Sequence, residues 1–283
     1  MTRPATAPRP LYSRSIDRLV GSAGVEPRGV KVPLQITALF WITKLVSTAM
    51  GESLADWLDG SANIVLAGLG GLVALLAFVV ALRLQFRAVR YVTAVYWFAV
   101  AMVATFGTMA ADALHQFLAA PYWLTTAFYA AVLALVFWRW WANERTLSIH
   151  SIDTRRREKF YWGAVMATFA LGTAAGDWTG DSLQLHYLPS GILFACIIAV
   201  PAVAYYLGMN AVVTFWFAYV LTRPLGASFA DYMDYPKARA GLGLPHVLVW
   251  GSLAAAMIIL TALLAVSERR SRDRSAGSSY AYA

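Results

Sequence analysis

The sequence predicts an all-α, polytopic membrane helix bundle with eight transmembrane helices, arranged as four repeated helical hairpins. Three observations support this fold class: an apolar composition, eight long apolar segments and a motif that recurs four times. Of the 283 residues, 59% are hydrophobic and 13% are charged, whereas a soluble domain carries about 25% charged residues. The mean hydropathy of +0.57 also excludes a disordered chain and an ordinary cytosolic enzyme.

Eight segments are long and apolar enough to cross a bilayer as helices. A hydrocarbon core of ~30 Å requires about 20 mostly apolar residues in a helix. Lipid offers no partners to backbone amides, so only helices or closed barrels can span it, and these segments are too long for barrel strands. The segments are 35–56, 62–82, 92–114, 122–141, 159–179, 187–207, 210–231 and 245–266.

The basic residues predict the orientation of the chain. Nineteen of the 23 Lys and Arg residues lie in the two tails and in the second and fourth connections, all on one side of the bundle. Cytoplasmic loops collect Lys and Arg. We therefore expect a multi-pass protein of the plasma (inner) membrane with both termini cytoplasmic. The net charge of +8 is explained by this bias, so membrane lipid and not nucleic acid is the expected partner.

The charge and composition boundaries divide the chain into three parts. A disordered basic cytoplasmic tail is predicted over residues 1–32, a transmembrane domain over 33–267 and a cytoplasmic tail over 268–283. Within the transmembrane domain, a cytoplasmic connector over 143–158 joins the second and third repeats. The repeats span about 33–88, 89–142, 159–208 and 209–267.

One motif recurs in the odd-numbered apolar segments. The copies are FWITKLVSTAMGESLAD, YWFAVAMVATFGTMAAD, YWGAVMATFALGTAAGD and FWFAYVLTRPLGASFAD. Each contains a Trp, a Gly ten residues later, and a small residue followed by Asp. The glycines are Gly51, Gly107, Gly172 and Gly226, and the aspartates are Asp56, Asp112, Asp177 and Asp231. All four motif helices should run in the same direction, as in the parallel repeats of some transporters.

Two interpretations of the motif aspartates stay open. In the first, each Asp lies in interfacial water and ends its helix, although the helix macrodipole opposes a negative charge at a C-terminus. In the second, the Gly and the small residue allow helices to approach closely, and the carboxylates converge in a central cavity. We favour the second interpretation.

Residues on the same helix faces add charge to this hypothetical cavity. Residues four apart share a face, which places five carboxylates opposite two cations. These groups are Glu52, Asp56, Asp112, Asp177 and Asp231, with Lys44 and Arg223. Clustered carboxylates in a site of low dielectric constant must bind protons or a cation. Ionisable residues inside a membrane are functional candidates by default.

Hydroxyl groups near each motif glycine could complete a cation site. They belong to Ser53, Thr108, Thr173 and Ser228. Carboxylates and hydroxyls are hard oxygen ligands, which suit Mn²⁺, Mg²⁺ or Ca²⁺. The alternative is that the hydroxyls only form hydrogen bonds to a neighbouring helix. We expect a divalent cation to be a substrate and not a tightly bound cofactor.

Lys44 and Arg223 also allow two interpretations. Each can form a structural ion pair with Glu52 or Asp56, or each can replace the substrate cation when the site is empty. No catalytic nucleophile is identifiable, so an enzyme is not expected.

The motif segments and the basic segment ERTLSIHSIDTRRREKFYW resemble a bacterial family of conserved, uncharacterised membrane-anchored proteins. The resemblance covers about residues 33–266 and is most specific in GESLAD, GTMAAD, GTAAGD and TRPLGASFAD. It implies the fold and a membrane location, but no activity. Small manganese and calcium exporters also repeat acidic motifs within the membrane. Their Glu-x-Gly-Asp pattern does not occur in this sequence, so that likeness is an analogy.

The leading functional hypothesis is a secondary transporter of a divalent cation such as manganese, in which the intramembrane carboxylates bind ion and protons in alternation. The alternative is a non-transporting membrane scaffold or binding protein whose aspartates only stabilise helix packing. The expected partners are lipid, a small inorganic cation and protons. The sequence is also compatible with an oligomer.

Overall fold

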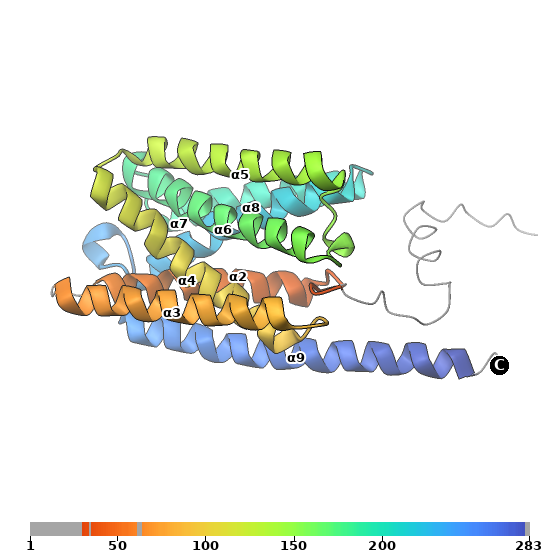
Figure 1. Cartoon of the computed structure of the whole chain (residues 1–283). Helices are drawn as coiled ribbons and strands as arrows, with labels where there is room; N and C mark the ends of the chain where they lie inside the picture. The colour runs from red at the N-terminus through yellow and green to blue at the C-terminus, as the bar shows by residue number, and fades with distance from the viewer. Residues whose placement is uncertain (1–29, 34, 61–63, 281–283) are drawn as a thin grey trace, which may run out of the picture.

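The computed structural model describes residues 30–33, 35–60 and 64–280, and these residues fold into an all-α bundle (Figure 1). Its long helices are α2 (Ala38–Asp59), α3 (Ile64–Arg87), α4 (Thr93–Leu118), α5 (Tyr122–Glu144), α6 (Arg155–Asp177), α7 (Tyr187–Tyr206), α8 (Ala211–Asp234) and α9 (His246–Tyr280). Short helical turns lie at Ile149–Ser151, Trp178–Ser182 and Lys237–Arg239. Most of the predicted disordered tail, residues 1–29, lies outside the described residues.

Local sequence determines where several helices begin. Thr37 accepts a hydrogen bond from the backbone amide of Phe40 at 3.3 Å, and Asn210 accepts one from Val212 at 2.9 Å. These side chains satisfy amides of the first turn, which have no partner within the helix. Gly208, whose φ is +90°, lies between α7 and α8 in a backbone conformation that favours glycine.

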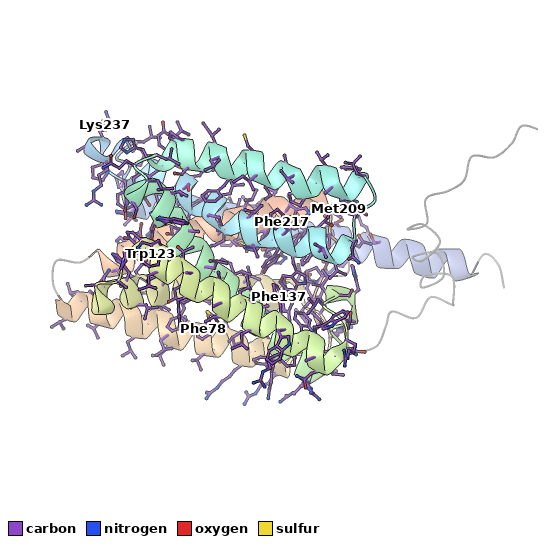
Figure 2. The ribbon with its side chains drawn as sticks, turned by 90° about the horizontal axis from the view of Figure 1, so that it is seen from above. Phe78, Trp123, Phe137, Met209, Phe217 and Lys237 are labelled. Carbon is purple, nitrogen blue, oxygen red and sulfur yellow. The ribbon has the colours of Figure 1, made fainter. Side chains whose placement is uncertain are left out.

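The motif helices α2, α4, α6 and α8 form a closed inner ring. In chain order each packs on the next, and α8 packs on α2. Figure 1 shows that α2 begins and α9 ends at the same end of the bundle. We call this the basic end, because Arg87 is the last residue of α3 and Arg145 follows α5 there, and we call the opposite end the acidic end. Figure 2 places Met209 at the basic end and Lys237 at the acidic end.

The four motif glycines allow the ring to close. Each one faces the residue that lies three positions before the glycine of the next motif helix. The pairs are Gly51 with Ala104, Gly107 with Phe169, Gly172 with Arg223, and Gly226 with Thr48. A Cβ atom added to Gly226 would lie 2.8 Å from Cβ of Thr48, closer than side chains approach without displacement. The contact recurs around the ring, so the motif helices have a pseudo-fourfold arrangement.

The outer helices are offset by one position around the ring. Each of α3, α5 and α7 packs mainly on the motif helix that follows it in the chain, and α9 packs on α2. For example, the rings of Phe78 in α3 and Phe106 in α4 stack at 4.7 Å, and Trp57 in α2 contacts Trp250 in α9 at 5.5 Å. The predicted hairpins are therefore consecutive in the chain, but the principal partner of each outer helix belongs to the following repeat.

Aromatic side chains close the inner ring at its basic end. The residue before each motif Trp contacts the motif Trp of the next helix, and we call these eight residues the aromatic girdle. The ring centroids are 5.5 Å apart for Phe40–Trp97, 5.7 Å for Tyr96–Trp162, 6.1 Å for Tyr161–Trp216 and 5.7 Å for Phe215–Trp41. Each aromatic pair contributes about 0.5–1.5 kcal/mol beyond the burial of its area. The girdle thus holds the motif helices together where the glycines do not.

The connector between the second and third repeats covers part of the girdle. Ile149 is 6% exposed and Ile152 is fully buried, and both belong to the same apolar core as the girdle. The carbonyl of Leu147 accepts a hydrogen bond of 2.9 Å from Nε1 of Trp216. The connector is therefore packed against the helical bundle.

The chain just before α2 also packs against the basic end. Nζ of Lys31 forms an ion pair of 2.8 Å with Glu158, whose side chain is fully buried. Gln85 donates hydrogen bonds to the Lys31 carbonyl and to Glu158. Residues 30–32, which the sequence assigns to the basic tail, thus lie against α3 and α6.

Apolar surface identifies the molecule as a membrane protein. Five helices, α3, α4, α5, α7 and α9, are long and apolar enough to cross a membrane. In the four outer helices only 17–28% of the apolar window is buried, against 67% in α4. The other motif helices, α2, α6 and α8, carry polar residues that the inner ring buries, which lowers their hydropathy. Eight spans therefore stay a prediction.

Substituting a motif glycine should weaken the ring. We expect Gly51→Ala to destabilise the protein by about 1–3 kcal/mol, because the added methyl group would meet Ala104 and the backbone of Thr105. Thermal unfolding in detergent measures the effect. The matched control is Gly251→Ala in α9, where no atom lies within 4 Å of the added methyl group. Equal unfolding midpoints for the two variants would contradict the close packing at Gly51.

Candidate functional site

The same-face positions of the motif helices form four layers along the inner ring. From the basic to the acidic end, the layers are Lys44, Val100, Val165 and Tyr219; Thr48, Ala104, Phe169 and Arg223; Glu52, Thr108, Thr173 and Ala227; and Asp56, Asp112, Asp177 and Asp231. Every residue of the first three layers is at most 3% exposed. In the fourth layer Asp231 is 5% exposed and the other aspartates are partly exposed. The axis is thus closed toward the basic end and more accessible at the acidic end.

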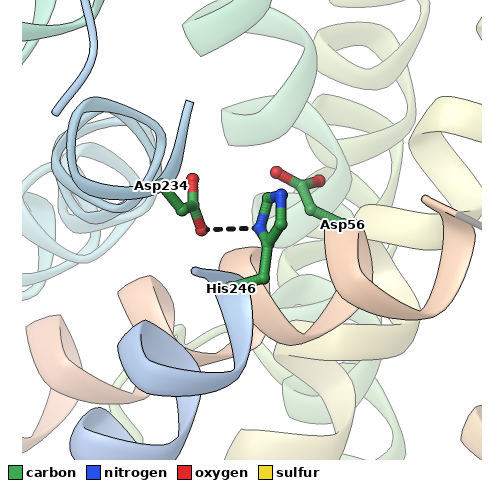
Figure 3. Close-up of side chains that lie close together, drawn as sticks. All are labelled: Asp56, Asp234 and His246. Atoms are coloured by element: carbon green, nitrogen blue, oxygen red, sulfur yellow. Dashed lines mark ion pairs between the residues drawn. The ribbon is translucent and has the colours of Figure 1, made fainter. Parts of the chain in front are cut away.

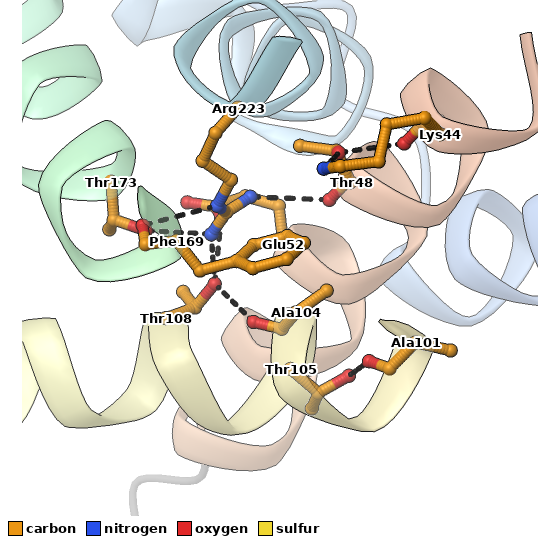
Figure 4. Close-up of polar contacts among 10 residues, drawn as sticks. All are labelled: Lys44, Thr48, Glu52, Ala101, Ala104, Thr105, Thr108, Phe169, Thr173 and Arg223. Atoms are coloured by element: carbon orange, nitrogen blue, oxygen red, sulfur yellow. Dashed lines mark hydrogen bonds and ion pairs between the residues drawn. The ribbon is translucent and has the colours of Figure 1, made fainter. Parts of the chain in front are cut away.

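Arg223 in α8 joins all four motif helices (Figure 4). Its Nη2 forms an ion pair with Glu52 of α2 and hydrogen bonds with Thr108 of α4 and, at 2.6 Å, with Thr173 of α6. Its Nη1 donates to the Thr48 carbonyl at 3.2 Å and its Nε to the Phe169 carbonyl at 3.4 Å. The structure therefore brings Arg223 to Glu52, one of the partners that the sequence allowed.

Lys44 lies between this network and the aromatic girdle. Its Nζ donates a hydrogen bond to Thr48 at 3.2 Å and lies 4.2 Å from the Phe169 ring centroid and 4.6 Å from that of Tyr219. Among the described residues it forms no ion pair, so of the two interpretations of Lys44 the structural pair with Glu52 or Asp56 is not observed. The faces of two aromatic rings attract the ammonium group instead.

Three carboxylates from different motif helices converge on the side of Arg223 that faces the acidic end. Glu52, Asp177 and Asp231 each offer an oxygen, and these oxygens lie within 4.8 Å of one another. This group, the carboxylate triad, is the convergence that the sequence predicted for part of its acidic set. Asp112 is outside the triad, and Asp56 approaches Asp234 and His246 instead.

The motif hydroxyls separate into two groups. Thr108 and Thr173, directly after the glycine, contact Arg223 on the axis. Ser53 and Ser228 lie one residue further, which turns them by about 100° around the helix. Ser228 accordingly lies against Gly191 of α7, and it is not part of the triad.

The acidic end contains two site residues that sequence reasoning missed. Asp234 ends α8 and is 4% exposed, and His246 begins α9. Nδ1 of His246 lies 3.1 Å from Oδ2 of Asp234. Both residues stand outside the repeated motif and are far from Asp56 in the chain, so no spacing rule connects them.

The electrostatic effect of these carboxylates reaches beyond the helices. Tyr235, directly after α8, stacks on Tyr187 at 4.8 Å. The negative charge of Asp56, together with burial, raises the pKa of the Tyr235 hydroxyl well above its ordinary value. The carboxyl groups at the acidic end therefore act on a residue outside the inner ring.

The fold and the site define a class of protein: a four-repeat helical membrane protein with a polar axis and an apolar exterior. The chain belongs to the family described as Repeat of Unknown Function (DUF347), which matches residues 39–91, 95–146, 160–208 and 214–270. This match confirms the resemblance to an uncharacterised four-repeat family. Neither a curated protein nor a solved structure gives a match to the chain.

The contribution of the Arg223–Glu52 pair can be measured by a double-mutant cycle. We expect Arg223→Met to cost about 3–5 kcal/mol, because it leaves Glu52 buried without its cation. Adding Glu52→Gln should recover part of this loss. Thermal unfolding of the two single variants and the double variant gives the coupling energy.

The control for this cycle is Arg156→Met, since Arg156 pairs with Glu144 at the surface and its side chain is 61% exposed. That change should cost no more than about 1 kcal/mol. Strictly additive effects of Arg223→Met and Glu52→Gln would show that the buried pair does not couple α8 to α2.

Proposed function

We propose that this protein is a secondary transporter of a divalent cation, coupled to protons, that crosses the plasma membrane eight times with its basic end in the cytoplasm. The observation that carries the proposal is the carboxylate triad. Three oxygens from three separate motif helices lie within 4.8 Å of one another beside a single arginine. Oxygen donors at this spacing suit Mn²⁺, Mg²⁺ or Ca²⁺.

The charge balance gives the triad a reason to bind a cation. Arg223 compensates Glu52 directly. Among the described residues, the carboxyl groups of Asp177 and Asp231 form no ion pair. Neighbouring carboxylates away from bulk water cannot all stay ionised without a counter-charge. Protons or a metal ion can supply that charge.

Competition between these positive charges provides the proposed coupling. A cation that binds Glu52, Asp177 and Asp231 competes with Arg223 for Glu52. Protonation of the aspartates weakens their attraction for the ion and favours its release. Arg223 forms hydrogen bonds with every other motif helix, so a change in its pairing would alter contacts around the whole ring.

The two ends of the axis suggest the direction from which ions approach. Asp56, Asp112 and Asp177 are partly exposed at the acidic end. At the basic end the girdle residues Tyr96 and Tyr161 are each 1% exposed, and the connector packs below them. Under this proposal, the conformation is a state closed toward the cytoplasm.

A non-transporting scaffold is the second candidate, and one observation favours it. Glu52, Thr108 and Thr173 already bind Arg223, as purely structural groups would. In that case removal of a triad carboxylate would alter stability alone. Transport measurements separate the two candidates.

Transport should depend on the triad. In proteoliposomes that contain the purified protein, we expect Asp177→Asn and Asp231→Asn to reduce radioactive Mn²⁺ uptake at least tenfold. Asp181→Asn is the control, because Asp181 is exposed at the same end and hydrogen-bonds Tyr187 instead of facing the axis. Wild-type uptake by both triad variants, or no uptake by any protein above empty vesicles, would remove the transporter proposal.

The orientation has its own test. In a Cys196→Ser background, a membrane-impermeant maleimide should label Asp181→Cys in intact cells and Arg145→Cys only after the membrane is opened. Both positions are exposed, at the acidic and basic ends respectively. The reverse labelling pattern would place the basic end outside the cytoplasm.

A further inference from the structure

We infer that Asp56, Asp234 and His246 form a second cation site, which selects first-row transition metals through its imidazole ligand. Figure 3 shows the three side chains turned toward one another. A carboxylate oxygen from each Asp and a ring nitrogen of His246 lie within 4.8 Å of one another. The residues come from α2, the end of α8 and the start of α9, where the last outer helix closes onto the first motif helix.

Two buried carboxylate oxygens of this group lack hydrogen-bond partners among the described residues. The side chain of Asp234 is fully buried, and its Oδ1 has no hydrogen bond in the described part of the chain. Oδ2 of Asp56 is likewise buried without one. Ser53 lies beside Asp234 and places a neutral hydroxyl, not a positive charge, next to that carboxylate. Unsatisfied carboxylate oxygens are costly in a protein interior, and a bound cation would remove that cost.

The ligand set differs in kind from the carboxylate triad. The triad offers oxygen alone, whereas this site offers one imidazole nitrogen and two carboxylates. Imidazole favours Zn²⁺, Co²⁺, Ni²⁺ and Cu²⁺ over the hard ions Mg²⁺ and Ca²⁺. Oδ2 of Asp234 lies 3.1 Å from Nδ1 of His246. Asp234 can therefore bind a metal together with Nδ1, or it can orient the ring for a metal bound to Nε2.

The local backbone holds these ligands in place and leaves access to them. Leu242 donates a hydrogen bond to the Tyr232 carbonyl at 2.7 Å, and Leu244 donates one to the Met233 carbonyl at 2.9 Å. The chain between Asp234 and His246 is thereby folded back on the end of α8. The His246 side chain is 37% exposed, so an ion can reach the site from the acidic end. The inference concerns binding and does not depend on transport.

Binding can be measured on the purified full-length protein after removal of any affinity tag. We expect Co²⁺ to give a visible d–d absorption band and Zn²⁺ to displace it, whereas Mg²⁺ should not. His246→Gln and Asp234→Asn should each weaken Co²⁺ binding at least tenfold. His150→Gln is the matched control, because His150 lies at the basic end in the connector. Size-exclusion profiles and thermal unfolding verify that each variant is folded.

Pulsed electron paramagnetic resonance of the Cu²⁺-loaded wild type provides a test that does not depend on whether the variants fold. Imidazole nitrogen modulation is expected at one equivalent of Cu²⁺. No imidazole signal in the wild type, or unchanged Co²⁺ affinity in His246→Gln, would overturn the inference. Asp231→Asn distinguishes the two proposals, because it should reduce Mn²⁺ uptake at least tenfold and leave Co²⁺ binding at this site intact.

Discussion

The inner ring depends on the hydrogen bonds and the ion pair of the buried Arg223 guanidinium group. An arginine side chain carries five N–H donors and cannot lose its charge, so burial requires acceptors on several sides. The helix that carries it cannot supply them, and they come from α2, α4 and α6 as Glu52, Thr108 and Thr173 with two backbone carbonyls. The close approach at the motif glycines brings these acceptors within reach. The buried charge of Arg223 and the close packing at the motif glycines therefore require the same closed ring.

This ring explains how polar and apolar residues divide between the helices. The motif helices face one another and bury their charged residues within the inner ring, and α3, α5, α7 and α9 pack around it. The one-position offset of the outer helices links each repeat to the next, and α9 completes the circle on α2. The two ends of the axis then differ in chemistry. The aromatic girdle closes the basic end, whereas carboxylates gather at the more exposed acidic end, and both proposed cation sites lie there.

Much of the candidate site could be predicted, because its residues recur at helical spacing within a repeated motif. The face that contains Glu52, Asp177 and Asp231 follows from the interval of four residues and the alignment of the four copies. Ser228 falls outside that face, since a single residue step turns a side chain onto another face. For Lys44 the same reasoning allowed an ion pair, whereas aromatic rings from other helices, and not a carboxylate, surround its ammonium group.

Composition and residue spacing were enough to predict the helical class, the eight long helices of the described residues, the common motif and the apolar character of the segments between the motif helices. These properties depend on composition and on spacing within one helix, which local chain geometry fixes. The neighbours of each helix came from the packing of the whole bundle: the offset of the outer helices, the contact of α9 with α2, and the meeting of Asp56, Asp234 and His246. Contacts between distant segments depend on how whole helix surfaces fit together, and residue spacing along one helix does not contain that information.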